Sequence, residues 1–386
     1  FAIRGGGGLA LVMPAPGRFF FIRCLLMAVG TLLAISVGAQ TEKAVEPVIE
    51  WHDVTTWDIE GREWVDEQRQ GWFDRLPQRA EGAVTDRVWE LSRSTVGMVV
   101  RFRTDSDEIL LDYALSKGVF NGVNTSPIGH SGFDMYARDE AGEWRWVESA
   151  GPREQTGQLA IARGLASGER EYALHLPSFN GLEALSIGVS EVAKFQPLPP
   201  RQNRPIVFYG TSINHGASAS RAGMVHTAIL GRWFDRPVVN LGFNGNGRMD
   251  AAVGELMGDI DAAVYVIDCL PNMNAAAVLE KCVPLVKQLR AAQPDIPIVL
   301  VEDRRNTNAW VFPDRSAHHD ANHAALKKCY AELRAAGFRD LYYIEGDNLL
   351  GNDGEGTADG SHPSDLGFWR QAKIFEPILR QALMGR

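Results

Sequence analysis

The chain lacks an excess of positive charge. Its 386 residues include 39 lysines and arginines against 48 aspartates and glutamates, which gives a net charge of −9. Because nucleic acids bind clustered positive charge, we expect no nucleic-acid partner. The hydrophobic share of 45% and the charged share of 23% are typical of a globular protein. The length predicts two domains, each able to bury its own core.

Cysteine is also scarce, with four residues and no CxxC spacing. This scarcity excludes a dense disulfide framework and a zinc site of the usual cysteine spacing. Cys24 lies in an apolar segment near the start of the chain, and the other three are Cys269, Cys282 and Cys329. Without that segment three cysteines remain, which is an odd number, so at least one thiol stays unpaired within a monomer.

A single apolar run lies near the start of the chain. Arg18 and Arg23 precede the apolar residues 24–37, and Val37-Gly38-Ala39 offers the small side chains that a signal peptidase accepts. We therefore predict a signal peptide over residues 1–39, cleaved after Ala39, and an exported protein with no stable membrane insertion afterwards. The alternative is an uncleaved anchor helix, but about 14 residues fall short of the ~20 that a span needs.

Residues 41–195 predict an N-terminal β-sandwich or jelly roll. Residues 96–103 and 108–113 flank a Thr-Asp-Ser-Asp turn and suggest a hairpin. Short strands at this spacing, without a long amphipathic helix between them, are typical of a sandwich. The Pro-rich segment 196–204 then predicts a stiff linker. The further strand candidates are 132–137, 143–149, 169–176 and 184–192.

Residues 205–386 predict a three-layer α/β/α domain around a parallel sheet. Apolar runs of buried-strand length alternate with stretches of helical period, and parallel strands need such crossovers. One helix is expected to bury Leu279, Cys282, Val283, Val286 and Leu289 on a single face. The expected strands lie at 205–209, 237–240, 262–267 and 296–301.

The first of these strands ends at a candidate nucleophile. In open α/β sheets ligands bind beyond the carboxyl ends of the strands, and Ser212 follows the strand at 205–209. Ser212 alone could simply cap a helix. However, Asp359 and His362 lie three residues apart in a loop near the C-terminus, where the carboxylate can orient the imidazole. A serine at the first strand–helix turn together with this Asp-x-x-His pair predicts nucleophilic acyl chemistry.

Two other strand ends offer donors for a developing oxyanion. The glycines of segment 240–247 permit backbone geometries that direct an N–H into the site. Asn272 follows the third strand, and its amide can donate a second hydrogen bond. A glycine turn and an asparagine helix cap are the structural alternatives.

This order of motifs resembles the SGNH, or GDSL-like, hydrolases over essentially all of 205–386. The resemblance implies Ser212 as the nucleophile, His362 as base and then acid, and Asp359 as its orienting residue. It implies the N–H groups of Ser212 and Gly245 and the Asn272 side chain as the oxyanion hole. Gly-Thr-Ser-Ile replaces the common Gly-Asp-Ser-Leu, and Leu-Pro-Asn replaces Gly-x-Asn-Asp.

A second motif narrows the resemblance to one subgroup of these hydrolases. Gly132-Phe133-Asp134-Met135-Tyr136 is similar to the Gly-x-Asp-Leu-Tyr signature of a preceding β domain. That subgroup implies an exported bacterial esterase that removes acetyl groups from polysaccharides, without a metal or cofactor.

Weaker patterns add further candidates. His215 and Arg221 follow the nucleophile, Glu302 follows the fourth strand, and Trp310 lies in a long loop; each could contact substrate or serve packing. His318, His319, Asp320 and His323 could form a metal cluster, although an exposed helix start explains them better. Seven tryptophans could form a sugar-binding platform or pack into the β core, namely Trp51, Trp57, Trp64, Trp72, Trp89, Trp144 and Trp146.

We therefore predict a secreted serine esterase acting on an O-acylated carbohydrate. A lipid or small ester is the alternative substrate, although no apolar lid segment is evident. A non-catalytic carbohydrate-binding protein on a hydrolase scaffold is the alternative from another class.

Overall fold

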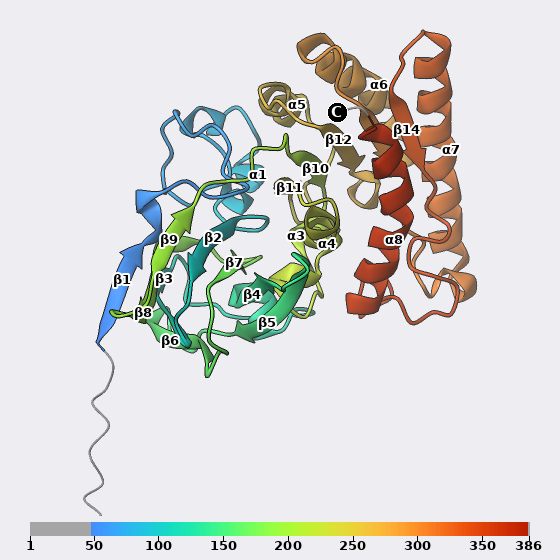
Figure 1. Ribbon diagram of the computed structural model, residues 1–386. Helices are drawn as coiled ribbons and strands as arrows, with labels where there is room; N and C mark the ends of the chain where they lie inside the picture. The colour runs from blue at the N-terminus through green and yellow to red at the C-terminus, as the bar shows by residue number, and fades with distance from the viewer. Residues whose placement is uncertain (1–47, 385–386) are drawn as a thin grey trace, which may run out of the picture. The chain divides into compact units, whose positions relative to one another are not determined.

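The computed structural model describes residues 48–384 (Figure 1). The expected signal peptide lies outside the described residues. Among residues 48–384, no helix combines the length and apolar character needed to cross a membrane.

An antiparallel β-sandwich forms the N-terminal part, as expected (Figure 1). Its core lies between two sheets, where Phe102, Leu111, Phe133 and Leu174 are fully buried. The first sheet has the order β1 (Ile49–Asp53), β8 (Leu182–Ser190), β3 (Glu108–Leu115) and β6 (Thr156–Arg163). The second has the order β5 (Trp144–Ala150), β4 (Phe133–Arg138), β7 (Arg170–His175), β2 (Val99–Thr104) and β9 (Phe195–Leu198).

The predicted hairpin is wrong. β2 pairs with β7 and β9, whereas β3 pairs with β6 and β8, so the turn between β2 and β3 carries the chain from one sheet to the other. Both strands bury alternate side chains, and this pattern fits a strand in either sheet. The expected linker is also partly structured, because its residues 196–198 belong to β9 at the edge of the second sheet.

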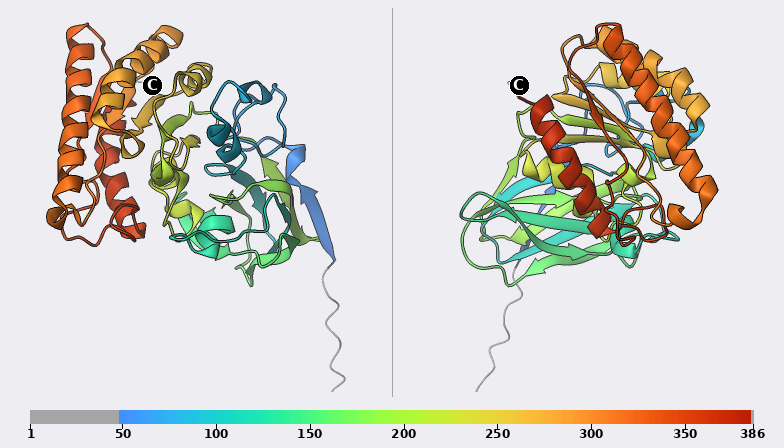
Figure 2. Two further views of the ribbon diagram at one scale, coloured as in Figure 1. Left: turned by 180° about the vertical axis from the view of Figure 1, so that it is seen from behind. Right: turned by 90° about the vertical axis from the view of Figure 1, so that its right-hand side faces the viewer.

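The C-terminal part is the expected parallel sheet with helices on both faces (Figure 2). Its strand order is β11 (Val238–Gly242), β10 (Ile206–Gly210), β12 (Val264–Asp268), β13 (Ile298–Val301) and β14 (Leu341–Ile344). One helix layer contains α5 (Ala251–Gly258), α6 (Ala275–Ala292) and α7 (Pro313–Ala335). The other contains α4 (His226–Trp233) and α8 (Asp365–Ala382).

Burial of both sheet faces explains the continuous apolar strands. Along β10, Val207 and Tyr209 pack toward α5–α7, whereas Ile206 and Phe208 pack toward α4 and α8. In α6 the predicted face is wrong at Leu279, which is 44% exposed. The buried face includes Val278 as well as the other four predicted residues.

The strand order places a ligand crevice at one edge of this sheet. The chain proceeds from β10 outward to β11 and then crosses to β12 on the other side of β10. Ligands bind at such a reversal, beyond the carboxyl ends of the strands. The turns after β10, β11 and β12 are therefore the place to look for a site.

The N-terminal part also contributes to the core of the C-terminal part. Leu76, Ala80, Val84 and Val88 pack in the same apolar cluster as β10 and β11. The buried guanidinium of Arg75 donates hydrogen bonds to backbone carbonyls of β11, at Asn240 (2.7 Å) and Gly242 (3.0 Å). The two parts are thus packed together through apolar and polar contacts.

Candidate active site

The turn after β10 holds Ser212 at the start of α3 (Ser212–His215). Thr211 caps this short helix: its side chain accepts from the N–H of Ile213, and the Asn214 side chain accepts from the Thr211 N–H. Ser212 is buried, with 6% of its surface exposed. As the first residue of a helix, Ser212 has a backbone N–H without an intrahelical acceptor.

The structure brings the three predicted triad residues together. Ser212 Oγ lies 2.9 Å from His362 Nε2, and His362 Nδ1 lies 2.8 Å from Asp359 Oδ2. With the Nδ1 proton donated to the carboxylate, Nε2 is the acceptor for the serine hydroxyl. The arrangement can therefore remove a proton from Ser212 and return it to a leaving group.

Hydrogen bonds keep Asp359 ionised. Partial burial acts to raise the pKa of this carboxyl, but the donors around it outweigh burial and hold the pKa well below its usual range. Oδ1 accepts from the backbone N–H groups of Ser361 (2.9 Å) and His362 (2.7 Å). Oδ2 accepts from the His362 ring and from the side-chain amide of Asn124 at 3.0 Å.

Sequence analysis missed Asn124, which lies 235 positions before Asp359 in the N-terminal part. No fixed spacing connects the two residues, and the segment around Asn124 resembles an ordinary polar loop. Only the packing of the two parts brings this amide to the triad.

The expected oxyanion donors lie in the turns that follow β11 and β12. Asn272 Oδ1 accepts from the Gly247 N–H at 3.2 Å, which leaves the amide nitrogen of Asn272 available as a donor. Gly245 has a φ of +72°, a conformation that favours glycine. Its N–H has no hydrogen-bond partner within residues 48–384. A Cβ on Gly247 would lie 2.0 Å from the Gly210 carbonyl oxygen, so this loop lies directly against the turn that precedes Ser212.

A pocket of about 460 Å³ lies beside His362. This volume is within the usual range for small-molecule sites. Apart from Ala217, Asn244 and His362, its walls come from the N-terminal part, namely Arg87, Leu91, Lys117, Val119, Gly122, Val123, Asn124, Thr125, His130 and Phe179.

Two of the weaker site candidates lie where the N-terminal and C-terminal parts of the chain pack together. His215 is fully buried, stacks on Phe179 and contacts Ser94 Oγ through Nε2 at 2.9 Å. Burial, with the nearby Arg75 guanidinium, lowers the pKa of His215 well below its usual value, so the ring is neutral. Arg221 forms an ion pair with the buried Asp134 at 2.8 Å. Both residues therefore make structural contacts between the two parts of the chain.

Glu302 and Trp310 also lie away from the triad's immediate contacts. Glu302 is buried and accepts hydrogen bonds from Tyr343 Oη (2.6 Å) and the Gly346 N–H (2.7 Å). Trp310 is 87% exposed and lines a separate open hollow with Arg305 and Asp347.

The histidines of the suspected metal cluster are engaged within the protein. His319 Nδ1 lies 3.1 Å from Asp303 Oδ2, and His323 Nε2 lies 2.7 Å from the Asp303 carbonyl oxygen. Both rings are buried rather than part of an exposed helix start. The residues that the structure describes contain no group of three or more His, Cys, Asp or Glu side chains placed to hold a metal.

Four of the seven tryptophans of the N-terminal part pack against an apolar core. Trp57 and Trp72 pack against the sandwich core, whereas Trp64 and Trp89 pack against the core of the parallel-sheet domain. Trp146 is 48% exposed, but its indole N–H donates to Asp134 at 2.9 Å.

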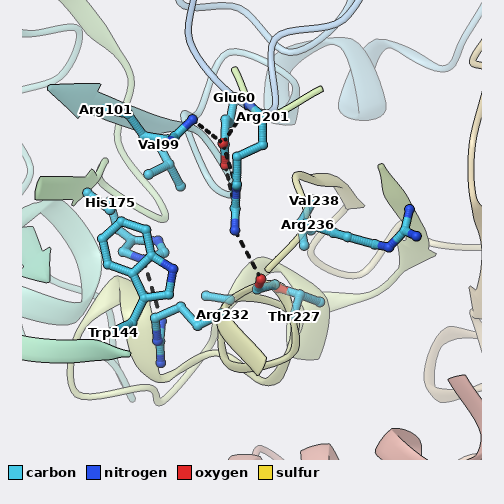
Figure 3. A pocket seen from close by; sticks show the side chains of 14 residues that line it. Glu60, Val99, Arg101, Trp144, His175, Arg201, Thr227, Arg232, Arg236 and Val238 are labelled. Atoms are coloured by element: carbon cyan, nitrogen blue, oxygen red, sulfur yellow. Dashed lines mark hydrogen bonds and ion pairs between the residues drawn. The ribbon is translucent and has the colours of Figure 1, made fainter. Parts of the chain in front are cut away.

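A second cavity lies where the two parts meet, near the amino ends of the parallel strands (Figure 3). Arg201 bridges Glu60 and the Gly231 carbonyl oxygen across it, and Arg232 contacts His175. Its volume of about 30 Å³ is too small for an ester substrate. Charged groups that join the two parts therefore surround this cavity.

Comparisons with known proteins agree with this architecture. Residues 203–380 match the GDSL-like lipase/acylhydrolase family, and residues 49–195 match the GxDLY domain found at the N-terminus of SGNH-hydrolase-type esterases. None of the curated proteins matches the sequence significantly.

Solved structures share the whole fold. A candidate GDSL-like lipase from Bacteroides ovatus is 29% identical, with 87% of this chain and 98% of that chain covered and a TM-score of 0.82. A salicylyl-acyltransferase from a tetracycline biosynthetic pathway is 17% identical (89% and 97% covered, TM-score 0.68). An acetyl xylan esterase from Butyrivibrio proteoclasticus is 11% identical (87% and 99% covered, TM-score 0.54). The chain belongs to the SGNH/GDSL-like family of ester hydrolases, in the subgroup with an N-terminal GxDLY domain.

Proposed function

We propose that the protein is a serine esterase that removes O-acyl groups, foremost O-acetyl groups, from carbohydrate. The observation that carries this proposal is the hydrogen-bonded chain from Ser212 Oγ through His362 to Asp359. An activated serine with an oriented histidine is the arrangement that acyl transfer through a covalent intermediate requires.

In the first half of the reaction, Ser212 Oγ attacks the ester carbonyl carbon while His362 Nε2 takes the hydroxyl proton. The carbonyl oxygen becomes an oxyanion, which the N–H groups of Ser212 and Gly245 and the Asn272 amide stabilise. Collapse of this intermediate breaks the bond to the alcohol oxygen. His362 gives the proton to that oxygen, and the acyl group remains on Ser212.

In the second half, water attacks the acyl-serine and His362 accepts its proton. The same donors hold the second oxyanion, and its collapse releases the carboxylic acid. The proton returns to Ser212 Oγ and restores the free enzyme. Asp359 stays ionised throughout, because its four donors favour the carboxylate, and it stabilises the imidazolium formed in each half.

Two observations support a carbohydrate ester as substrate. The fold is shared with an acetyl xylan esterase and with a family two carbohydrate esterase from Cellvibrio japonicus, which is 13% identical with a TM-score of 0.57. The pocket beside His362 mixes apolar and polar walls, as a sugar ring with an attached acyl group requires. The apolar run and small residues before position 40 support action outside the cytoplasm.

The first experiment replaces the nucleophile. Ser212→Ala is expected to reduce hydrolysis of 4-nitrophenyl acetate by at least about a thousandfold without a change in Tm. Ser167→Ala, in an exposed turn of the N-terminal part, is the matched control and should retain full activity. Wild-type turnover by the Ser212 variant would exclude the mechanism.

A fluorophosphonate probe distinguishes the esterase from a non-catalytic carbohydrate-binding protein. Only an activated serine forms the covalent adduct, which mass spectrometry should locate on Ser212. The polymer is then identified by measuring acetate released from acetylated xylan, mannan, pectin and peptidoglycan. Release from none of them, with 4-nitrophenyl acetate still cleaved, would favour a small or lipid ester.

A further inference from the structure

The N-terminal part contributes directly to the candidate triad through the loop between β3 and α2 (Pro127–Ser131). We propose that Asn124 in this loop is a positioning residue for the esterase reaction, so that the active site is shared between the two parts of the chain. The inference rests on the proposed function, because it assigns a role beside the same triad.

The hydrogen bonds of Asp359 define this role. Its Oδ2 accepts two N–H donors, the ring of His362 at 2.8 Å and the side-chain amide of Asn124 at 3.0 Å. The two donor nitrogens lie 3.1 Å apart, both directed at the same oxygen. Because Oδ1 is held by two backbone N–H groups, Asn124 supplies the remaining donor that fixes the plane of the carboxylate. The carboxylate in turn fixes the ring that faces Ser212.

The same loop is also bonded to the segment that follows the nucleophile helix. Asn124 Oδ1 accepts from Thr125 Oγ1 at 3.3 Å, and Thr125 Oγ1 accepts from the Ser218 N–H at 3.2 Å. Ser218 has a φ of +71°, so the backbone turns sharply there after α3. Asn124 therefore joins the acid side of the triad to the nucleophile side through a continuous chain of hydrogen bonds.

The loop itself is anchored on both sides of Asn124. Before it, the Asn180 side chain accepts from the Lys117 N–H and donates to the Lys117 and Val119 carbonyl oxygens. After it, Gly129 packs so closely on the Ala219 carbonyl that a Cβ would lie 2.2 Å from that oxygen. An anchored loop can hold the Asn124 amide in place, which positioning requires.

The position of Asn124 also places it in contact with the space a substrate would occupy. Val119, Val123, Asn124 and Thr125 line the same pocket as His362. The other charged or titratable groups that line it are Arg87, Lys117 and His130. Burial and the Lys117 charge lower the pKa of His130, so that ring is neutral near pH 7 and adds no charge beside the triad.

Asn124→Ala in the full-length chain tests this role. We expect kcat for 4-nitrophenyl acetate to fall by about ten- to a hundredfold, with KM within about twofold and Tm unchanged. Labelling of Ser212 by a fluorophosphonate should slow by a similar factor, because it reports activation of the serine without a bound sugar. Asn203→Ala, at an exposed asparagine between β9 and β10, is the control and should behave as wild type.

Asn124→Asp is the second variant and keeps the side-chain shape. A carboxylate facing Asp359 and the His362 ring favours the imidazolium, so the acidic limb of the kcat/KM profile should move by at least about half a pH unit toward higher pH. If Asn124 only held the two parts together, its substitution would lower Tm and leave the acidic limb of the kcat/KM profile at its wild-type pH.

The results separate the two proposals. One outcome would overturn the positioning role alone. In that outcome Ser212→Ala is inactive, but both Asn124 variants have a normal kcat, a normal rate of labelling and an unshifted pH profile. Wild-type activity in Ser212→Ala would overturn the proposed function itself. If Asn124→Ala lowers Tm, the kcat/KM profile of Asn124→Asp decides whether Asn124 positions the triad. An acidic limb at the wild-type pH would then reject the inference.

Discussion

At the scale of single residues, Asn272 is the proposed oxyanion donor that can be removed with least disturbance. Its Oδ1 accepts from the Gly247 N–H, so the opposite end of the amide is left to donate. We expect Asn272→Ala to lower kcat by about a hundred- to a thousandfold with little change in KM, because the lost hydrogen bond forms mainly in the transition state.

Asn274 offers a matched control only two positions away. Its side chain caps α6 by accepting from the Ala277 N–H at 2.9 Å. Asn274→Ala should therefore cost about 1 kcal/mol of stability and leave kcat unchanged. Steady-state kinetics and urea unfolding of the two variants measure this contrast. Equal kcat values would mean that Asn272 makes no transition-state contact.

Asp268, at the end of β12, predicts a pH dependence of stability. Burial, together with the nearby Asp303 carboxylate, raises its pKa to about 7, although Arg304 opposes the shift. Between about pH 4 and pH 7 the folded protein therefore binds more protons than the unfolded chain, and this residue's contribution to stability falls as pH rises. Above about pH 7 the protonated Asp268 no longer contributes to the free energy of unfolding.

Asp268→Asn removes this dependence. The variant should gain about 3 kcal/mol of stability over wild type as pH rises from 4.5 to 8, because most of the interval between the two pKa values lies in this range. Urea unfolding at the two pH values measures the gain. A constant difference between variant and wild type would contradict a raised pKa for Asp268.

At the same scale, the candidate triad could be read from the sequence because its signals are local. Asp359 and His362 share one loop, and Ser212 directly follows a recognisable buried strand. The structure brings these three side chains into hydrogen-bond contact. Asn124 could not be identified in this way, because its contact with Asp359 depends on how two distant segments of the chain pack together.

At the scale of elements, the sequence identifies strands more readily than their partners. Residues 99–104 and 108–115 show the alternation of half-buried strands, and both are strands in the structure. The short turn between them favours a hairpin, yet the chain crosses to the other sheet of the sandwich. Alternation reports burial of one face and contains no information on the neighbouring strand. β14 was missed for another reason: its two central residues are only partly buried, so it lacks the fully buried apolar run that marks β13, a strand of the same length.

The loop after β11 supports a prediction on two glycines. A Cβ on Gly247 would lie 2.0 Å from the Gly210 carbonyl oxygen and 3.0 Å from the Thr211 nitrogen. Gly247→Ala must therefore displace the backbone that positions Ser212, and we expect at least about a hundredfold loss of kcat. Gly245→Ala meets no atom within 4 Å and bears only the cost of a φ of +72°, about 1 kcal/mol of stability.

Kinetics and thermal unfolding of the two variants measure the difference. Because only the N–H of Gly245 enters the proposed oxyanion hole, its alanine variant should keep most of its activity. A greater loss of kcat in Gly245→Ala than in Gly247→Ala would show that the loop approaches the nucleophile differently.

At the scale of the whole molecule, the GxDLY motif is explained by packing between the two parts. Asp134 is fully buried and accepts hydrogen bonds from Arg221 Nη1 and the Gly223 N–H, both at 2.8 Å. Tyr136 contacts the same guanidinium through its hydroxyl at 2.5 Å. Arg221 and Gly223 lie a few residues after α3, so the motif fixes the N-terminal part against the segment that follows Ser212.

Substitution of Arg221 distinguishes this structural role from the substrate contact that the sequence predicts. Arg221→Met leaves the Asp134 carboxylate buried without its ion partner, and the loss of one partner of such a pair costs about 3–5 kcal/mol. We expect a lower Tm, together with unchanged KM for 4-nitrophenyl acetate at temperatures where the variant is folded. Arg145→Met, which breaks an exposed pair with Asp139, should leave Tm nearly unchanged.

The double variant Asp134→Leu/Arg221→Met tests the origin of the loss. Removing both charges eliminates the buried carboxylate that Arg221→Met leaves without its ion partner, so the double variant should be more stable than Arg221→Met alone. Thermal unfolding with and without a fluorophosphonate adduct on Ser212 shows whether the parts unfold together. A raised KM in Arg221→Met with unchanged Tm would instead place this guanidinium against the substrate, because only a substrate contact weakens binding without weakening the fold.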